Sequence, residues 1–349
     1  MKIAILYSNH TPLLSYNDDW LESFFDIKNI FVKKYNVLEL NLFQSQRILF
    51  EYDYIVLLHS TNSNSFTLPK LYRLGCLNFR KAKIIYFVGN EYKLMREKIN
   101  FAKLNHIEYI VSQLPQDTAE WLYEKTNSKI ISLPHALNAK VFKSINSFED
   151  RIIDVGNRSY EYPWYLGDVD RVKTLEFLDK LDVNLKLDIS TNPLKRFNRQ
   201  EWANFLNTCK FTIASEAGSS FLERDDKTRK LVNEYIDKNP DITFEKIYEK
   251  FFKNYKGESI NGKCVSSRHF DAVGTKTCQI LLEGRYNDIL EPNIHYLELK
   301  KDFSNINEVI EKMKNPIHIK EIVDNAYEYV MDNHTHKHRI KYLFSEVMK

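Results

Sequence analysis

Arg268 and Asp271 lie in a short segment whose residue types suit the binding of a nucleoside diphosphate. The segment reads Ser266-Ser-Arg-His-Phe-Asp271. Ser267 is a favourable N-cap residue, and a helix N-terminus offers free N–H groups and partial positive charge to an anion. Arg268 and Asp271 are three residues apart and share one helical face. A guanidinium can hold a pyrophosphate through two hydrogen bonds. A carboxylate one turn later can accept hydrogen bonds from the hydroxyl groups of a ribose.

The same residues also fit a purely structural role. Arg268 and Asp271 could form an exposed ion pair worth about 0.2–0.5 kcal/mol, and Ser267 could be an ordinary cap. The apolar run at 277–282 favours the binding role, because it predicts a buried strand of a parallel sheet. A helix that precedes such a strand begins at the carboxyl edge of the sheet, where nucleotides bind in open α/β folds.

Short apolar runs alternate with longer helical patterns along the chain, as in βαβ units. In the first half we predict helices at 20–35, 67–77 and 118–125 and strands at 2–6, 36–40, 54–58, 83–87, 109–111 and 130–133. A polar stretch at 143–150 separates these from strands at 152–155, 185–189, 211–214, 277–282 and 296–299. The chain is therefore expected to be an α/β protein with domains at 1–146 and 147–330.

Two charged amphipathic helices, at 225–238 and 243–255, interrupt the second alternation. Pro240 ends the first of them, and both fall in an insertion at about 221–262. The second helix carries an apolar stripe, which we expect to pack the insertion onto its domain; a surface for a partner or a membrane is the alternative. The stripe consists of Phe244, Ile247, Tyr248, Phe251 and Phe252.

Charge and cysteine usage limit the functional classes. The 349 residues include 50 basic and 47 acidic ones, a net charge of +3, which argues against a dedicated nucleic-acid binder. The four cysteines are scattered singly, a pattern typical of reduced cytosolic thiols. The start of the chain is too short for a signal-peptide core, and we expect a cytoplasmic protein with no membrane span.

The second half resembles the donor domain of GT-B glycosyltransferases. It is most similar to the bacterial "glycosyl transferases group 1" subgroup related to spore-maturation-type and surface-polysaccharide transferases. The resemblance extends from about residue 133 to the end of the chain, and before it is only architectural. It implies two Rossmann-like parallel-sheet domains facing a cleft. The segments that carry it are Leu133 to Phe142, Asp154 to Arg171, Ala214 to Ser220, Ser266 to Asp271 and Leu297 to Phe303.

This resemblance assigns roles to individual residues. Arg268 and Asp271 match an Arg-x-x-Glu motif that contacts pyrophosphate and ribose, with Asp in place of the longer Glu. Glu216 corresponds to the first acid of a Glu-x7-Glu pair in retaining members, although the insertion displaces the second acid. The nucleotide-sugar donor, a UDP- or GDP-sugar, is therefore expected on Gly156, Asn157, Arg158, Arg171, Ser267, Arg268, His269, Phe270 and Asp271.

Cleavage of the bond between sugar C1 and the diphosphate places negative charge on the leaving group. Arginines and a helix N-terminus can neutralise that charge, so no metal is expected. Asp168 and Asp170 are interpreted as a helix-capping turn. The acceptor's base, needed only for an inverting reaction, is expected after a strand of the first sheet, with His59 and Glu91 preferred. The catalytic candidates are therefore Glu91, His59 and Glu216.

The resulting hypothesis is that the protein is a metal-independent glycosyltransferase that acts on a glycan, lipid-linked or surface-polysaccharide acceptor. Peripheral association with a membrane is a further expectation. A phage-type transferase that glycosylates a DNA base is one alternative, and a non-catalytic nucleotide-binding partner subunit is another. GT-B proteins return their last helix to the first domain. We therefore expect 331–349 to cross back, with Ile340, Leu343 and Phe344 as its apolar stripe.

Overall fold

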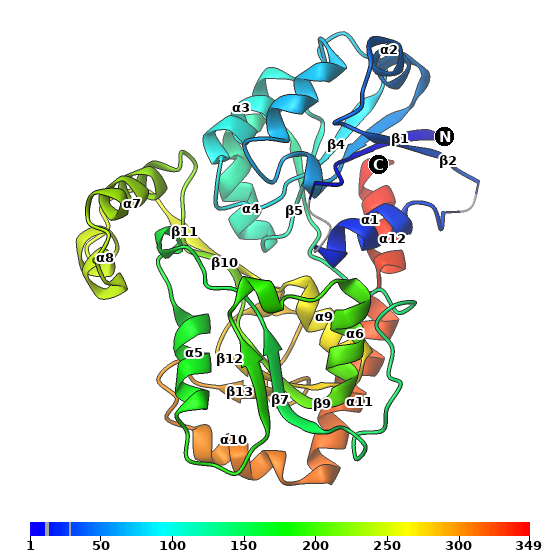
Figure 1. Ribbon diagram of the computed structural model, residues 1–349. Helices are drawn as coiled ribbons and strands as arrows, with labels where there is room; N and C mark the ends of the chain where they lie inside the picture. The colour runs from blue at the N-terminus through cyan, green and yellow to red at the C-terminus, as the bar shows by residue number, and fades with distance from the viewer. Residues whose placement is uncertain (11–13, 28) are drawn as a thin grey trace.

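Two parallel sheets, one in each of two domains, form the centre of the molecule. The computed structural model describes residues 1–10, 14–27 and 29–349, and Figure 1 shows one domain above the other. The first sheet has the order β2-β1-β3-β4-β5-β6, with every neighbouring pair parallel. Its strands are β1 (Lys2–Tyr7), β2 (Phe31–Asn36), β3 (Tyr54–Leu57), β4 (Lys83–Phe87), β5 (Tyr109–Ser112) and β6 (Lys129–Ser132).

Helices cover both faces of the first sheet, which explains why its central strands are continuously apolar. One core cluster packs under α2 and α3 and the other under α1. The α-helices are α1 (Ser15–Ser23), α2 (Leu42–Glu51), α3 (Met95–Leu104) and α4 (Gln116–Tyr123). The 3-10 helices are η1 (His59–Thr61), η2 (Leu68–Leu74) and η3 (Glu124–Thr126).

The second sheet has the order β13-β12-β9-β7-β8 and is also parallel. Its strands are β7 (Ile153–Arg158), β8 (Leu187–Ser190), β9 (Cys209–Ala214), β12 (Cys278–Leu282) and β13 (Leu297–Leu299). The helices of this domain are α5 (Asp170–Asp179), α6 (Arg199–Thr208), α9 (Ser267–Gly274), α10 (Ile306–Met313) and α11 (Pro316–Asn333), with the 3-10 turns η4 (Trp164–Leu166), η5 (Pro193–Lys195) and η6 (Tyr286–Asp288).

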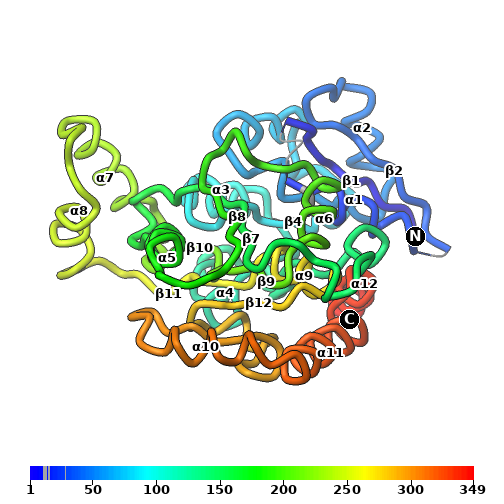
Figure 2. Tube along the Cα trace, turned by 60° about the horizontal axis from the view of Figure 1, so that its bottom comes forward, coloured from blue at the N-terminus to red at the C-terminus, as the bar shows by residue number. Residues whose placement is uncertain are grey.

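An insertion interrupts the second domain between β9 and α9. It consists of an antiparallel hairpin, β10 (Ala217–Leu222) and β11 (Ile260–Cys264), which carries α7 (Lys227–Lys238) and α8 (Phe244–Phe251). The helices project from the side of the molecule (Figure 1, Figure 2). Ile247 and Phe252 of the predicted stripe are buried with Val232 of α7, so these members pack the insertion onto itself and onto η4.

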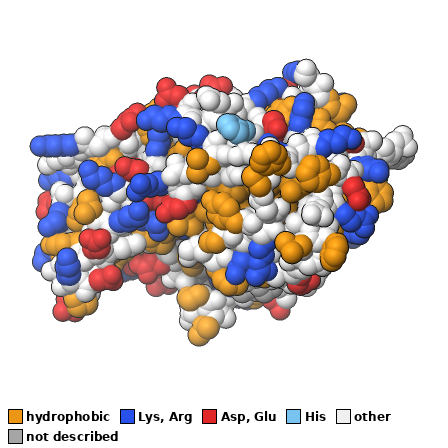
Figure 3. Space-filling model, turned by 90° about the horizontal axis from the view of Figure 1, so that it is seen from above, with side chains coloured by type: hydrophobic (Ala, Val, Ile, Leu, Met, Phe, Trp, Pro, Cys, Tyr) orange, Lys and Arg blue, Asp and Glu red, His pale blue; other side chains and the backbone are white. Residues whose placement is uncertain are grey.

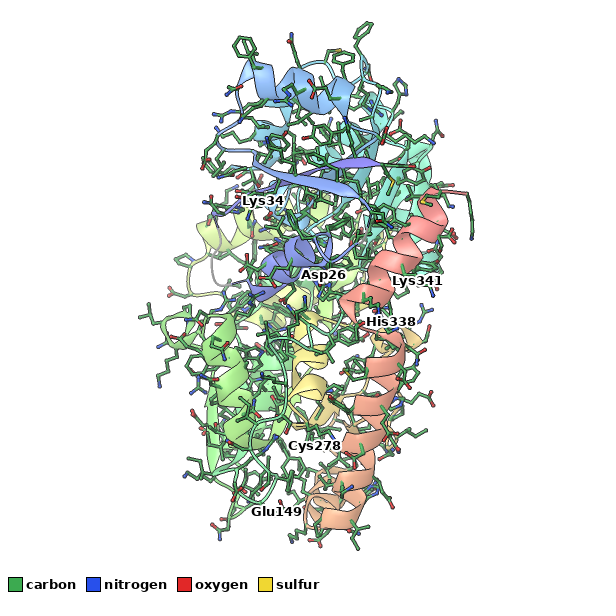
Figure 4. All side chains as sticks on the ribbon, turned by 90° about the vertical axis from the view of Figure 1, so that its right-hand side faces the viewer. Asp26, Lys34, Glu149, Cys278, His338 and Lys341 are labelled. Atoms are coloured by element: carbon green, nitrogen blue, oxygen red, sulfur yellow. The ribbon has the colours of Figure 1, made fainter. Side chains whose placement is uncertain are left out.

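The last helix, α12 (His336–Val347), lies on the first domain (Figure 4). Ile340, Leu343 and Phe344 are buried in one cluster with Trp20 and Phe24 of α1. The chain passes between the domains at the 133–152 linker and again at 334–335. The two passages are hydrogen bonded, because Leu137 N donates to His334 O (2.9 Å) and His336 N donates to Leu137 O (3.2 Å).

Some predicted elements were wrong. The helix predicted at 20–35 ends at Ser23, and the strand predicted at 36–40 lies earlier, as β2. Further along the predicted range, Asn29 has a left-handed φ of 63°, which a continuous helix does not accommodate. Lys33 and Lys34 are exposed on an edge strand, so the strand lacks a clear apolar period. Within the described part of the chain, no helix is long and apolar enough to cross a bilayer.

Candidate functional site

A cavity of about 520 Å³ lies between the two domains, a size suited to a small-molecule substrate. The carboxyl ends of both parallel sheets face it, so the loops that follow the strands supply its walls. From the first domain it is lined by Tyr16, Asn64, Asn90, Glu91, Tyr92 and Lys93, among others. From the second it is lined by Arg158, Tyr160, Tyr162, Arg171, Arg196, Ser267, Arg268 and Asp271, among others.

Arg268 and Arg171 form a cationic pair at the N-terminus of α9. Burial, and next the charge of Arg171, lowers the pKa of Arg268 to about 10. The Arg171 guanidinium lies 3.7 Å from the centre of the Tyr162 ring and donates to Tyr160 O (3.3 Å). Among the described residues, neither arginine has a carboxylate within ion-pair distance. Two neighbouring cations that lack a carboxylate partner among the described residues suit this end of the cavity to an anionic ligand.

The N-cap of α9 is Ser266 rather than the predicted Ser267, which is the first helical residue and lines the cavity. His269 accounts for this start, because its Nδ1 accepts a hydrogen bond from Ser266 N (2.9 Å). The His269 ring is therefore buried in the cap rather than exposed in the cavity. Phe270 is buried in the core of the second domain with Tyr286.

Asp271 lies one turn after Arg268 and lines the same cavity, as the spacing predicted. Its carboxyl group is 2% exposed and accepts a hydrogen bond from Trp202 Nε1 (3.1 Å). Burial, and next the charge of Asp19 in the first domain, raises the pKa of Asp271 well above its ordinary value. Asp271 therefore places a carboxyl group in the same cavity as the Arg171–Arg268 pair.

Arg158 also lines the cavity, but its charge is already balanced. It pairs with Asp188 (2.7 Å) and lies over the Phe205 ring, 4.5 Å from the ring centre. Gly156 and Asn157 precede it in β7 and lie outside the lining. A Cβ at Gly156 would stand 2.3 Å from Cys209 Sγ, and Asn157 donates to Ile213 O (2.6 Å), so both residues shape the sheet beneath the site.

Among the described residues of the first domain, Glu91 is the acidic residue that lines the cavity. Its Oε1 accepts from Ser112 Oγ and Tyr123 OH, both at 2.7 Å, and its Oε2 accepts from Gln113 N (3.0 Å). Burial raises the pKa of Glu91, while these hydrogen bonds oppose the shift. A carboxylate has about four acceptor positions, so one position on Oε2 is left.

His59 and Glu216 do not line the cavity. His59 is 1% exposed and packs against the rings of Trp20, Phe87 and His135. Burial holds the pKa of His59 well below its ordinary value. Glu216 accepts a hydrogen bond from Tyr286 N (2.7 Å), and burial raises the pKa of its carboxyl group.

The loop between β4 and α3, which carries Asn90 to Lys93 into the cavity, is held by a lysine that was not predicted. Lys98 is fully buried, and its ammonium donates to the carbonyls of Gly89, Asn90 (2.9 Å) and Lys93 (2.8 Å). Burial lowers the pKa of Lys98 to about 7. In the sequence Lys98 looks like any lysine of an amphipathic helix, so its burial could not be predicted.

Lys93, Arg196 and four tyrosines were also missed. Lys93 and Arg196 line the cavity, and neither forms an ion pair with another described residue. Burial, and next the charge of Arg229, lowers the pKa of Lys93. The rings of Tyr16, Tyr92, Tyr160 and Tyr162 border the same space. The pair Tyr160 and Tyr162, which follows the strand predicted at 152–155 by a few residues, was a usable signal for the site.

No group of three or more His, Cys, Asp or Glu side chains is placed to share a metal ion in the described residues. Asp168 pairs with Lys263, and Asp170 is the first residue of α5. His336 and His338 lie in α12, and His334 precedes the N-cap of that helix.

Comparisons with known proteins agree with this architecture. Residues 238–345, just under a third of the chain, match a family described as glycosyl transferase-like. No curated protein matches the sequence. HepE (Alr3699) of Anabaena, solved with UDP-glucose, is similar in structure, with a TM-score of 0.57 and 10% identity, over 99% of this chain and 100% of that one.

Two solved structures of β-glucosyltransferase have the same fold. T4 phage β-glucosyltransferase is 12% identical with a TM-score of 0.54, over 100% of this chain and 98% of that one. A β-glucosyltransferase described as a DNA-modifying enzyme is 11% identical with a TM-score of 0.54, over 95% and 94%. At these identities the likeness concerns the fold alone. The fold is GT-B, so the predicted fold class is confirmed.

Proposed function

We propose that this protein is a glycosyltransferase that takes a glycosyl group from a nucleoside diphosphate sugar and transfers it to a hydroxyl group of an acceptor on the first domain. The observation that carries the proposal is the Arg171–Arg268 pair at the N-terminus of α9, which lacks a carboxylate partner among the described residues. The UDP-glucose in the HepE structure makes UDP the first nucleotide to test, ahead of GDP.

In the proposed reaction the acceptor oxygen forms a bond to sugar C1 while the bond from C1 to the diphosphate oxygen breaks. The electron pair of the broken bond goes to the leaving diphosphate. Arg268, Arg171 and the N–H groups of α9 would stabilise the charge that develops there. Asp271 would accept hydrogen bonds from the hydroxyl groups of the nucleotide ribose beside them. Retention or inversion at C1 decides whether a separate base is needed.

For an inverting reaction we propose that Glu91 is the base that takes the proton from the acceptor hydroxyl group. It lines the cavity, its pKa is raised, and one acceptor position on Oε2 is left. His59 and Glu216 remain weaker candidates, because neither lines the cavity. Glu91→Gln should abolish transfer and leave UDP affinity unchanged. A Glu91→Gln variant that folds normally and keeps its full transfer rate would remove Glu91 from this role.

Calorimetry with UDP, GDP and ADP tests the donor site directly, because it requires neither the sugar nor the acceptor. We expect UDP to bind and its affinity to fall in Arg268→Ala. Release of free sugar from UDP-glucose without acceptor would then exclude a non-catalytic partner subunit. Failure of all three nucleotides to bind the folded protein would refute the proposal. Activity retained after EDTA treatment would support the metal independence that we propose with it.

A DNA base is the second candidate acceptor. The fold shared with a DNA-modifying β-glucosyltransferase supports it, as does Lys93, a cation without an ion-pair partner among the described residues on the acceptor side. DNA binding should weaken steeply between 50 and 200 mM salt. Transfer of labelled glucose to duplex DNA would favour this acceptor, and transfer to a lipid-linked or free glycan would favour the first. With a glycan or lipid-linked acceptor, we also propose a role in surface-polysaccharide synthesis and a cytoplasmic location.

A further inference from the structure

Lys263 of β11 forms a buried ion pair at the base of the insertion. Its ammonium pairs with the carboxylate of Asp168, and the two side chains are 9% and 7% exposed. The pair of Lys253 with Glu249, farther out on the insertion, is by contrast hydrated, with side chains 60% and 67% exposed. Figure 3, which looks down on the first domain, shows basic and acidic side chains mixed over the side where α7 and α8 lie. Removal of one partner from a buried ion pair leaves the other as a costly unpaired charge.

Asp168 belongs to the segment that begins α5 and carries Arg171. Asp168 and Asp170 are the acids nearest to Arg171 in the sequence. Burial, and next the charge of Asp168, raises the pKa of Asp170, so the two carboxyl groups lie close together. Neither forms an ion pair with Arg171 in the part of the chain that the structure describes. The Arg171 guanidinium lies instead against the Tyr162 ring, 3.7 Å from the ring centre. Arg171 is therefore unpaired although two acids stand beside it.

Lys263 explains why these acids leave Arg171 unpaired. Its ammonium occupies Asp168, and its charge also acts on Asp170. The same ammonium lies 5.7 Å from the centre of the Tyr162 ring, which is the ring that Arg171 contacts. Without Lys263 the Asp168 carboxylate would be a buried anion beside Arg171, a cation with no other carboxylate partner. A pair formed by Asp168 with Arg171 would cancel the charge that Arg171 now offers to a ligand.

The hairpin that carries Lys263 is held by both domains. Leu222 of β10 and Cys264 of β11 are 1% and 4% exposed and belong to a core cluster of the first domain. Ser219 Oγ donates to Leu166 O (3.1 Å) in η4, the turn that precedes α5 in the second domain. Close packing on one side and a hydrogen bond on the other fix the position of the hairpin. Lys263 is therefore presented from a rigid support rather than from the projecting helices.

We propose that Lys263 is a positioning residue of the donor site: it occupies Asp168 and thereby leaves the charge of Arg171 to the diphosphate of the donor. This inference rests on the proposed function, because it requires a diphosphate beside Arg171. Lys263 itself is not expected to touch the ligand. Gly262 and Cys264 line the cavity and Lys263 between them does not, because successive residues of a strand face opposite sides. The insertion thus contributes to donor binding from behind the cavity wall.

Calorimetry with UDP on the full-length protein tests this role. Lys263→Met should raise the Kd for UDP at least about tenfold, because Asp168 then neutralises Arg171. Adding Asp168→Asn should restore the parental Kd, because the competing carboxylate is gone. Lys263→Arg keeps the positive charge and should stay close to the parent. The matched control is Lys210→Met, which breaks another lysine–aspartate pair of the second domain, with Asp154 (3.0 Å) near the amino ends of β9 and β7, and should leave UDP affinity unchanged.

The comparison of Asp168→Asn with the double variant Lys263→Met, Asp168→Asn covers the case in which Lys263→Met alone does not fold. We expect these two proteins to bind UDP equally. Weaker binding by the double variant would overturn the inference, because Lys263 would then act by a route other than Asp168. Parental affinity in folded Lys263→Met would overturn it as well. Failure of the parent to bind any nucleotide would instead refute the proposed function, and this inference with it.

Discussion

The charge of Arg268 is available to a ligand because no described carboxylate pairs with it. We expect Arg268→Ala to weaken UDP binding by about 2–3 kcal/mol, the loss of a charge-assisted pair of hydrogen bonds. Arg268→Lys should recover only part of this, because an ammonium cannot form the two parallel hydrogen bonds of a guanidinium. Calorimetry with UDP is the measurement, and exposed Arg96→Ala is the control. Wild-type affinity in folded Arg268→Ala would contradict the assignment.

Lys98 should stabilise the β4–α3 loop, which lines the cavity on the side of the first domain. Lys98→Met leaves three backbone carbonyls of the β4–α3 loop without their donor, at a cost of about 1–3 kcal/mol in the free energy of unfolding. Because that loop carries Asn90 to Lys93, the KM for acceptor should rise while UDP affinity stays constant. Denaturant unfolding and steady-state kinetics check this.

The control for Lys98 is Lys103→Met on the same helix, where the side chain is exposed. A Lys98→Met protein with parental stability would show that the three hydrogen bonds contribute little. A fall in UDP affinity would show that the loop acts on the donor instead.

The sequence predicted which residues of one helix lie together, because that placement depends on local spacing. Spacing predicted that Arg268 and Asp271 share a helical face, and both line the cavity. It could not reveal Lys98, whose hydrogen bonds depend on carbonyls brought near it by folding, nor Lys93, which lines the cavity from the opposite domain. His59 and Glu91 both follow strands, and only packing separates the buried ring from the carboxyl group that reaches the cavity.

At the scale of elements, the insertion of the second domain caps a helix of the first. Asp226 Oδ2 accepts from Met95 N (2.8 Å) at the start of α3, where the N-cap residue Leu94 has no side-chain acceptor. Nearby, Arg224 donates to Trp121 O (2.6 Å) in α4 and pairs with Glu124 (3.0 Å). The insertion therefore contacts both domains beside the cleft.

Asp226→Ala should remove this cap and cost about 1 kcal/mol in the free energy of unfolding, within the usual range for a lost N-cap. The loss should also raise hydrogen exchange in the first turn of α3. Asp225→Ala is a matched control, because Asp225 accepts from Lys227 N within its own segment. Equal effects of the two substitutions would show that the contact with α3 is not the cause.

The elements predicted best are the buried strands of the parallel sheets, because their apolar runs are continuous and bounded by polar turns. The elements missed have competing patterns. Leu42, Phe43 and Phe50 are apolar but exposed in α2, so they obscure the helical period of its sequence. The exposed lysines of β2 interrupt the alternation of an edge strand. The β10–β11 hairpin was missed because its strands are separated by two helices.

For the molecule as a whole, buried histidines make the docking of α12 sensitive to acid. The His336 ring packs on Trp20, 4.9 Å between ring centres, and burial, with the charge of His135 next, lowers its pKa to about 3. The unfolded chain takes up a proton on this ring below pH 6.5, and the folded protein does not until about pH 3. This contribution to stability is thus complete above pH 6.5 and is lost progressively as the pH falls toward 3.

His336→Phe should therefore flatten the pH dependence of the unfolding free energy between pH 6.5 and 5, by up to about 1.4 kcal/mol per pH unit. Chemical denaturation at several pH values measures the slope. His318→Gln, on a partly exposed ring of α11, serves as the control. An unaltered slope in His336→Phe would show that other buried histidines, such as His135, carry the effect.

The return of α12 also sets the order in which the protein can mature on the ribosome. The first domain is begun before the second, yet Ile340, Leu343 and Phe344 of its core are made only after the whole of the second domain. At ordinary synthesis rates the 190 or so residues from 147 to 336 take roughly 10–40 s. During that interval the Trp20 and Phe24 side chains lack their cover and are available to chaperones. The first domain is therefore begun before the second domain and completed after it.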